Sequence, residues 1–283
     1  MTRKHVLVEK HSGEKEPFSP EKLHESLLRS GASEAQVEAV EKALQPKLFE
    51  GITTGEIYKR AFQLLRKTKR SSAARYSLKQ AIMELGPSGY PFERFVGEVI
   101  SRMGFETTVG VMVQGHCIQH EVDVVARNHQ EQFMVECKFY NSQGKYCNVR
   151  VPLYIDSRFR DVAKAWEKDP LNKSLSFSGW VVTNTRFTSD AMDYGRCVGL
   201  RMVSWDYPRK HSLKDMIEKA GLFPVTALTL LTKNQKQILL DQGHVLVRHI
   251  LDKPGLLESI GLTKVKARRV LDEAEELVSQ LPS

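Results

Sequence analysis

The sequence has few cysteines and no long apolar run. Only four cysteines occur among 283 residues, and none of them form the C-x-x-C spacing of a zinc or redox site. Cysteines this sparse do not make the disulfide framework of a secreted domain. No apolar run approaches the roughly 20 residues needed to cross a bilayer, and the charged N-terminus contains no signal-peptide core. The sequence therefore predicts a cytoplasmic protein without a membrane partner.

Positive charge exceeds negative charge along the chain. Lysine and arginine number 42 against 34 aspartates and glutamates, which gives a net charge of +8. This excess favours a polyanionic partner through a salt-dependent attraction. The length leaves room for two or three domains, and Gly86-Pro87-Ser88-Gly89 is typical of a linker. We predict three domains, at residues 1–87, 88–208 and 209–283.

Two segments in the middle of the chain place charged side chains on one face of a predicted β-hairpin. Residues 121–126 and 133–140 are rich in β-branched or aromatic residues and flank a polar turn. Side chains alternate along a strand, so Glu136 and Lys138 project together and Asp123 can join them. Charges on a face otherwise suited to a core are costly unless they serve each other or a metal. We interpret them as a site; an exposed polar hairpin face is the alternative that the spacing alone allows.

The chemistry of these residues suits hydrolysis of a phosphodiester. Asp123 and Glu136 offer the hard oxygen ligands that Mg²⁺ binds together with water and phosphate oxygens, and Mn²⁺ would serve as well. Lys138 can position the attacking water or stabilise the pentacovalent state as a fixed positive charge. Glu93 is a further acid, at the edge of the apolar stripe of a helix predicted between Pro91 and Gly104.

The order of predicted elements indicates the fold class. A helix is followed by three strands, a helix around residues 158–166, a strand, a helix and a short strand, which predicts a mixed sheet with helices on both faces. The first eighty-odd residues predict a short β-hairpin and four helices, the last over residues 72–85. From Pro208 onward the pattern is helical. We therefore predict an α/β core with a mainly helical N-terminal domain and an all-α C-terminal domain.

Several motifs of the central region occur together in one known family. They are Phe92-Glu93, Gly104-Phe105, His120-Glu121-Val122-Asp123, Glu136-Cys137-Lys138-Phe139, Val182-Thr183-Asn184 and Phe187-Thr188-Ser189-Asp190-Ala191. Residues 88–207 thereby resemble the restriction-endonuclease fold of the PD-(D/E)xK superfamily, nearest to its Mrr-type branch. The resemblance implies that Asp123, Glu136 and Lys138 are catalytic, with Glu93 as the helix acid. Many Mrr-type members carry Gln where Glu136 stands here.

The N-terminal region contains a second set of motifs. They are Val8, Lys10, Gly13, Glu16, Phe18, Lys22-Leu23, Gly51-Ile52-Thr53-Thr54, Ile57 and Ala74-Arg75-Tyr76. This region resembles the ATP-cone, a regulatory nucleotide-binding module best known from ribonucleotide reductases. The resemblance implies that Lys10, Lys22 and Thr54 contact the phosphates or ribose of ATP or dATP. A lysine pair around a glycine turn at a helix start also suits a phosphate chain on physical grounds.

The resemblance implies that the hairpin folds over the nucleotide, with Val8, His11, Gly13 and Glu16 beside it. The sequence departs from the family at two of these positions. His11 stands where the family often has Arg, and Ser12 where it often has Asp. A weaker phosphate clamp, an altered nucleotide preference or lost binding would follow, and an ATP-cone kept only for oligomer contacts is the alternative.

The C-terminal region contains a basic cluster. Residues 257–262 followed by Ala267 are similar to one helix-hairpin-helix unit, whose turn offers backbone N–H groups to a phosphate. The second glycine of the usual hairpin is missing. Candidate DNA contacts are Arg158 in the central region and Lys264, Lys266, Arg268 and Arg269 on the last helix. A solvated helix face or a protein-binding helical cap is the alternative for this cluster.

Together these features predict a Mg²⁺-dependent DNA endonuclease of the restriction type, regulated by ATP or dATP. ATP-cones change the oligomeric state of the enzymes that they control, so we expect a homo-oligomer in which two sites are coupled. One alternative is an ATP-responsive nucleic-acid-binding or oligomerising regulator on a nuclease scaffold without turnover. The other is a structural partner subunit whose outer helical regions serve assembly.

Overall fold

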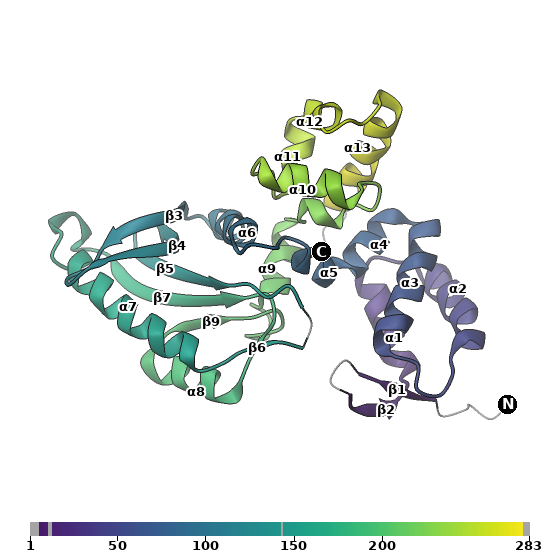
Figure 1. Cartoon of the computed structure of the whole chain (residues 1–283), viewed down its shortest axis with the longest axis horizontal. Helices are drawn as coiled ribbons and strands as arrows, with labels where there is room; N and C mark the ends of the chain where they lie inside the picture. Colours follow the sequence, from purple (N-terminus) through teal and green to yellow (C-terminus); the bar gives the residue numbers. More distant parts are fainter. Residues whose placement is uncertain (1–5, 11–12, 143, 280–283) are drawn as a thin grey trace.

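The chain folds into an α/β core flanked by two helical regions. A computed structural model describes residues 6–10, 13–142 and 144–279. Figure 1 shows the sheet at one end of the molecule, the N-terminal helices at the other end, and the C-terminal helices over the junction between them. The predicted fold class, an α/β core with a mainly helical N-terminal region and an all-α C-terminal region, is confirmed.

The N-terminal region is a β-hairpin followed by helices. Its strands pair antiparallel, and its elements are β1 (Leu7–Glu9), β2 (Lys15–Pro17), α1 (Pro20–Arg29), α2 (Glu34–Leu44), the 3₁₀ helix η1 (Gln45–Lys47), α3 (Thr54–Thr68), α4 (Arg70–Tyr76) and α5 (Leu78–Met83). The prediction of one helix over residues 72–85 is wrong, because the chain leaves the helical conformation at Ser77. The Ser77 hydroxyl donates to the Ala74 carbonyl at 3.1 Å, and such side-chain bonds compete with the helical ladder.

The central region contains a five-stranded mixed sheet in the order β3-β4-β5-β7-β9. The strands are β3 (Glu106–Gln114), β4 (Gln119–Arg127), β5 (Glu131–Lys138), β7 (Ser176–Thr183) and β9 (Arg201–Val203), and a separate pair is formed by β6 (Tyr146–Cys147) and β8 (Arg186–Phe187). The first three strands run antiparallel, whereas β7 is parallel to both β5 and β9. The parallel strands require crossover connections, which the helices provide.

Helices cover both faces of this sheet. They are α6 (Tyr90–Ser101), α7 (Arg150–Trp166), the 3₁₀ helix η2 (Pro170–Asn172) and α8 (Ser189–Val198). The side chains of α6 pack on Phe133 and Val135 of β5, whereas α7 and α8 pack on Met134 and the opposite face. A Cβ atom at Gly97 would lie 2.8 Å from Val109 Cγ2, so the close approach of α6 to β3 depends on glycine.

The C-terminal region is a set of short helices followed by one longer helix. They are α9 (Leu213–Ala220), the 3₁₀ helix η3 (Val225–Ala227), α10 (Lys233–Asp241), α11 (Val247–Asp252), α12 (Gly255–Ser259) and α13 (Lys264–Ser279). Gly261, with φ +85°, forms the turn between α12 and α13. In the described part of the chain, every helix is too short or too polar to span a membrane.

One hydrophobic cluster joins all three regions. Its buried members include Ala81 and Ile82 of α5, Phe92 of α6 and Leu277 of α13. A second cluster lies within the N-terminal region, and a third lies under α7 and α8. The predicted domain boundaries at residues 87 and 208 stay predictions, but the last helices of the N-terminal region share a core with the C-terminal helices.

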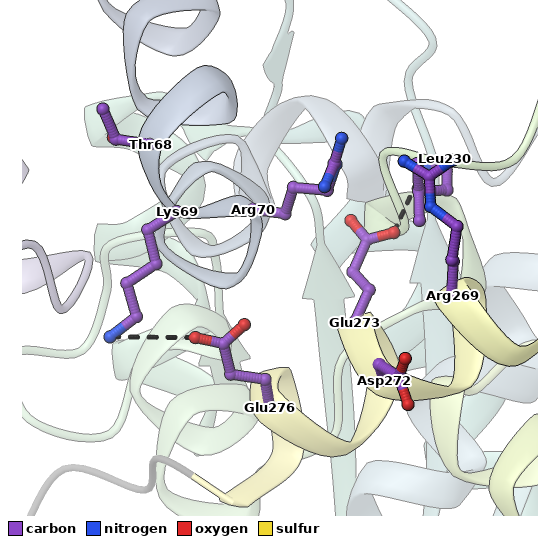
Figure 2. A pocket seen from close by; sticks show the side chains of 8 residues that line it. All are labelled: Thr68, Lys69, Arg70, Leu230, Arg269, Asp272, Glu273 and Glu276. Carbon is purple, nitrogen blue, oxygen red and sulfur yellow. Dashed lines mark hydrogen bonds and ion pairs between the residues drawn. The ribbon is translucent and has the colours of Figure 1, made fainter.

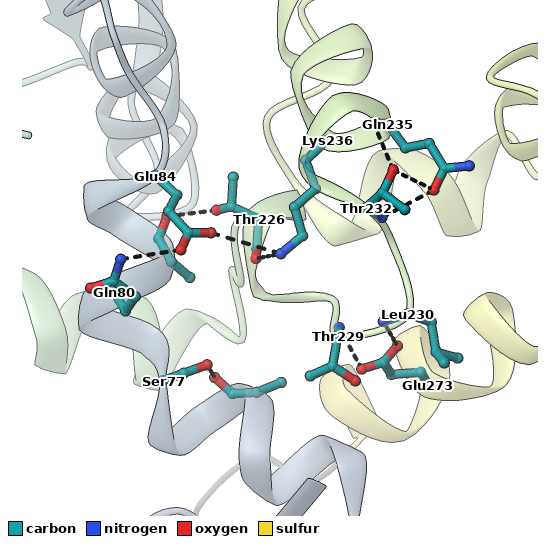
Figure 3. Close-up of polar contacts among 12 residues, drawn as sticks. Ser77, Gln80, Glu84, Thr226, Thr229, Leu230, Thr232, Gln235, Lys236 and Glu273 are labelled. Atoms are coloured by element: carbon teal, nitrogen blue, oxygen red, sulfur yellow. Dashed lines mark hydrogen bonds and ion pairs between the residues drawn. The ribbon is translucent and has the colours of Figure 1, made fainter. Parts of the chain in front are cut away.

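Polar contacts follow the same junction. Figure 3 shows Thr226, whose hydroxyl donates to the Ala81 carbonyl at 2.6 Å and whose own carbonyl accepts from Lys236 Nζ at 2.6 Å. The Lys236 ammonium also lies 3.8 Å from a carboxylate oxygen of Glu84. The Lys236 side chain is only 16% exposed and has both an acceptor and a counter-charge, so this contact fixes α10 against the end of the N-terminal region.

Candidate active site and nucleotide site

The two central strands of the site separate where the acidic residues stand. Pairing between β4 and β5 ends at Val124 opposite Val135. One residue further, the Asp123 carboxylate accepts the Cys137 backbone N–H at 2.7 Å in place of a ladder bond. Glu136 follows Val135 directly, so the end of the ladder brings the Asp123 and Glu136 carboxylates together.

Arg158 of α7 is part of this cluster. One guanidinium nitrogen donates to Glu136 Oε2 at 2.9 Å and to the Glu121 carbonyl at 3.0 Å. The other donates to the Tyr154 hydroxyl at 3.1 Å, and the guanidinium lies 4.8 Å from the centre of that ring. The Arg158 and Glu136 side chains are both 14% exposed. The structure thus places Arg158 as the counter-ion of Glu136, and a contact with a DNA phosphate stays a prediction.

The carboxyl groups of the cluster affect one another's protonation. Burial, followed by repulsion from Asp123, raises the pKa of Glu136 to about 7. Burial raises the pKa of Glu93 to about 7 as well, and the charges of Asp123 and Glu136 add to this shift. Burial also raises the pKa of Asp123, against the opposing effect of the Cys137 N–H. The charges of Asp123 and Glu136 thus act on Glu93 of α6, whose role as a further acid of the site stays a prediction.

These residues fit a divalent metal ion through two carboxylates. Among the described residues, no group of three or more His, Cys, Asp or Glu side chains is arranged to hold a metal. Asp123 and Glu136 each use one oxygen in a hydrogen bond, which leaves one oxygen of each carboxylate for an ion. Mg²⁺ commonly takes one or two carboxylates and fills its other positions with water and phosphate oxygens. Asp123 and Glu136 would hold such an ion.

Neighbouring side chains of β7 fix the backbone that carries Lys138. The Thr183 hydroxyl donates to the Lys138 carbonyl at 2.7 Å. Asn184, which follows β7 directly, binds both backbone groups of Tyr140, two residues after Lys138. Its side chain accepts from the Tyr140 N–H at 2.9 Å and donates to the Tyr140 carbonyl at 2.7 Å. Thr183 and Asn184 are fully buried. Thr183 and Asn184 thus fix the end of β5. The Lys138 ammonium has no ion pair within the described chain.

Sequence reasoning did not predict a contact beside the site between His120 and Asp161. His120 Nε2 lies 2.8 Å from Asp161 Oδ2, and the other Asp161 oxygen accepts the Cys117 N–H at 2.8 Å. These bonds hold the tip of the β3–β4 hairpin against α7. The helix predicted around residues 158–166 begins eight residues earlier, at Arg150. Tyr154, Arg158 and Asp161 follow i, i+4, i+7 spacing, which was the signal for one functional face on that helix.

The predicted nucleotide-binding residues of the hairpin are partly brought together. Lys10 Nζ lies 2.8 Å from Glu16 Oε2 and 3.1 Å from Glu14 Oε2, and Lys22 Nζ lies 3.7 Å from the other Glu16 oxygen. The bonds to Glu16 and Glu14 raise the pKa of Lys10. Gly13, with φ +83°, forms the turn and donates its N–H to the Lys10 carbonyl at 2.9 Å.

Val8 and Thr54, two further predicted residues, lie in different parts of the N-terminal region. Val8 is 2% exposed and belongs to the core of the N-terminal region. Thr54 opens α3, directly after Thr53, which forms a bridge with Glu9 of the hairpin. His11 lies outside the described residues. The roles of these residues in nucleotide binding stay predictions.

The basic cluster of the C-terminal region is exposed on α13. Lys264, Lys266, Arg268 and Arg269 are all exposed, and Arg268 pairs with Asp272 at 3.0 Å. Figure 2 shows Arg269 at the rim of a cavity of about 350 Å³ between α13 and the start of α4. Contact of this cluster with DNA stays a prediction.

The pKa values of the cluster predict how stability depends on pH. The folded-state pKa of Glu136, about 7, lies above its ordinary value of 4.5, so the folded chain keeps a proton that the unfolded chain releases. Stability from this group is complete below the unfolded pKa and is lost as the pH rises through about 7. The free energy of unfolding of the metal-free protein should therefore decrease between pH ~5 and ~8. We expect this decrease to be smaller in Glu136→Gln than in wild type by about 1–3 kcal/mol.

Urea denaturation at several pH values measures this difference. Glu38→Gln, at an exposed position of α2, is the matched control and should leave the pH dependence unchanged. An equal slope in wild type and Glu136→Gln would contradict the assignment.

Family models match three consecutive parts of the chain. They describe an ATP cone domain over residues 6–82, a restriction endonuclease domain over residues 86–153 and an AF1548-like C-terminal domain over residues 223–278. Both resemblances found in the sequence are thereby confirmed. An ATP cone together with a restriction endonuclease domain suggests a nuclease with nucleotide regulation.

Relatives of the chain include an uncharacterized protein of Archaeoglobus fulgidus. It is 35% identical over 184 residues, which are 65% of this chain and 99% of the relative. The crystal structure of AF1548, a protein of unknown function, is also similar, with a TM-score of 0.55 and 34% identity over 68% of this chain and 99% of that one. The chain therefore belongs to the AF1548-like family, and it carries an ATP cone domain in front of its restriction endonuclease domain.

Proposed function

We propose that this protein is a metal-dependent DNA endonuclease regulated by ATP or dATP bound to its ATP cone. The observation that carries the proposal is the meeting of Asp123 and Glu136 at the point where β4 and β5 separate, with Lys138 on the same strand face. Mg²⁺ or Mn²⁺, when bound, would supply neutralisation of the phosphate charge and activation of a water. Asp123 and Glu136 are the proposed ligands.

The ion pair of Arg158 defines the task left to Lys138. Arg158 takes up one oxygen of Glu136, so the Lys138 ammonium stays available for the substrate. We assign Lys138 to orient the attacking water or to stabilise the charge that develops on the phosphate. Burial raises the pKa of both Glu93 and Glu136 to about 7. Because Glu136 is assigned to the metal, Glu93 is the proposed proton donor or acceptor near neutral pH.

DNA would approach this end of the sheet. The proposed phosphate contacts are Arg158, which pairs with Glu136 in the cluster, and the exposed Lys264, Lys266, Arg268 and Arg269 of α13. Contacts of this kind position the duplex without reading its sequence.

A cleavage assay tests the proposed function. Purified full-length protein is incubated with supercoiled plasmid, linear duplex, single-stranded DNA or RNA, with Mg²⁺, Mn²⁺ or a chelator, and with or without ATP or dATP. We expect the protein to cleave DNA only when the metal is present. The rate of cleavage should change when the nucleotide is added. Cleavage that survives the chelator, or the lack of cleavage of every substrate, would contradict the proposal.

A second candidate function is an ATP-responsive nucleic-acid-binding or oligomerising regulator without turnover. It is favoured by one observation, the ion pair that occupies Glu136 in a site with only two metal-ligand carboxylates. Gel-shift titration and light scattering with and without ATP distinguish the candidates. Binding or assembly that responds to ATP, without hydrolysis in the assay above, would select this second function.

Under the first candidate function, we propose that the endonuclease also forms homo-oligomers whose size depends on the nucleotide.

Nucleotide binding predicts a change in thermal stability. Millimolar ATP or dATP is expected to raise the melting temperature, because a ligand present at 100 times its Kd adds about 2.7 kcal/mol to the free energy of unfolding. Lys10→Ala should lose most of this shift. Lys15→Ala, at an exposed position of β2, is the matched control and should keep it. Equal melting temperatures with and without nucleotide in wild type would count against a working ATP cone.

A further inference from the structure

A small cavity lies between the ATP cone domain and the region that follows the last strand of the sheet. Its volume is about 160 Å³, and it shares no lining residue with the candidate active site or the nucleotide site. One wall is formed by α1 and the α4–α5 segment, and the other by Trp205 and α9. It is therefore a separate site at a domain junction, where ligand pockets occur preferentially.

The charges that line this cavity do not balance. Its cationic side chains are Arg29, Arg75, Lys79 and Lys214, and Glu218 is its one carboxylate. Lys214 lies 3.6 Å from Glu218, whereas neither Arg29 nor Lys79 has an ion pair or hydrogen bond within the described residues. The larger cavity of Figure 2 differs, because its three cations are matched by Asp272, Glu273 and Glu276.

Two of the cations are withdrawn from water without full compensation. Burial, and then the charge of Arg186, lowers the pKa of Lys79, whose ammonium lies 6.0 Å from the centre of the Trp205 ring. Arg75 donates to the Leu277 carbonyl at 2.7 Å, but its Nε is buried without a partner. Cationic donors that are partly withdrawn from water and incompletely paired carry a free-energy cost, and an anion with several acceptor oxygens would satisfy them.

We propose that this cavity binds a phosphate group. Phosphate offers a double negative charge and several acceptor oxygens, which suit arginine and lysine donors. The volume of about 160 Å³ is smaller than the roughly 300 Å³ at which sites for drug-sized molecules begin, so it accommodates phosphate or pyrophosphate rather than a whole nucleotide. The group is supplied either by a free small anion or by a nucleic-acid backbone. Bound there, it links the ATP cone to α9.

Titration of the metal-free protein with inorganic pyrophosphate tests the proposal. All variants carry Lys10→Ala, so that the nucleotide site contributes little, and without metal the result does not depend on nuclease activity. In this background we expect Arg29→Ala with Lys79→Ala to weaken pyrophosphate binding by about tenfold or more, as the loss of two charged contacts implies. Lys69→Ala, which removes one cation from the balanced cavity, is the matched control and should bind as the parent does.

A short DNA duplex, titrated in the same way, identifies the source of the phosphate. Weaker pyrophosphate binding with unchanged DNA binding assigns the site to a free anion, and weaker DNA binding without pyrophosphate binding assigns it to the backbone. Equal affinity of the parent and the double variant for both probes, or binding of neither probe by the parent, would overturn the proposal. Arg29 is exposed at the end of α1, so Arg29→Ala alone repeats the test if the double variant does not fold.

Discussion

Asp123→Asn is expected to reduce the rate of metal-dependent DNA cleavage by about 10³-fold or more. The substitution removes the negative charge that would face the ion. The amide oxygen of asparagine can still accept the Cys137 N–H, which Asp123 binds at 2.7 Å, so the strand end should keep its conformation. Single-turnover cleavage of plasmid at saturating Mg²⁺, with a melting curve as the check on folding, gives the measurement.

Lys138→Ala should cause a loss of similar size without loss of stability, because the ammonium has no ion pair within the described chain. Lys145→Ala, at an exposed position beyond the same strand, removes the same charge away from the site and should cleave at the wild-type rate. A cleavage rate of Asp123→Asn or Lys138→Ala close to that of wild type would contradict the assignment of this cluster as the active site.

The acidic cluster was predictable because it depends on local rules. Alternation along one strand places Glu136 and Lys138 on one face whatever the rest of the fold does. The hairpin turn then sets β4 beside β5 and brings Asp123 to the same end. Helix starts at Ser33 and Thr53 are likewise local, since each side chain accepts the N–H three residues ahead.

The partners of the cluster could not be predicted in the same way. Arg158 and Glu136 are 22 residues apart and meet only because α7 packs on the sheet. The apolar face of a helix shows that it packs, but it does not show against what. The same limit applies to α5, because the glycine-rich linker at residues 86–89 indicated a boundary while Ala81 and Ile82 belong to a core shared with the C-terminal helices.

Glu273→Ala is expected to lower the free energy of unfolding by about 2–4 kcal/mol. Glu273 is 4% exposed, and its two oxygens accept the Thr229 and Leu230 N–H groups at 2.7 and 3.1 Å. Figures 2 and 3 show this carboxylate reaching from α13 to the segment before α10. Alanine cannot accept these bonds, so two half-buried backbone donors would lose their acceptors. The segment that contacts the ATP cone through Thr226 would then lose its anchor.

Chemical denaturation of the full-length protein measures this loss. Glu275→Ala, two residues along α13 and exposed, is the matched control and should change the free energy of unfolding by less than about 0.5 kcal/mol. If nucleotide binding acts on the nuclease through this junction, Glu273→Ala should also weaken the effect of ATP on cleavage while leaving the melting shift of the ATP cone in place. A Glu273→Ala protein as stable as the control would show that the two N–H groups find other acceptors.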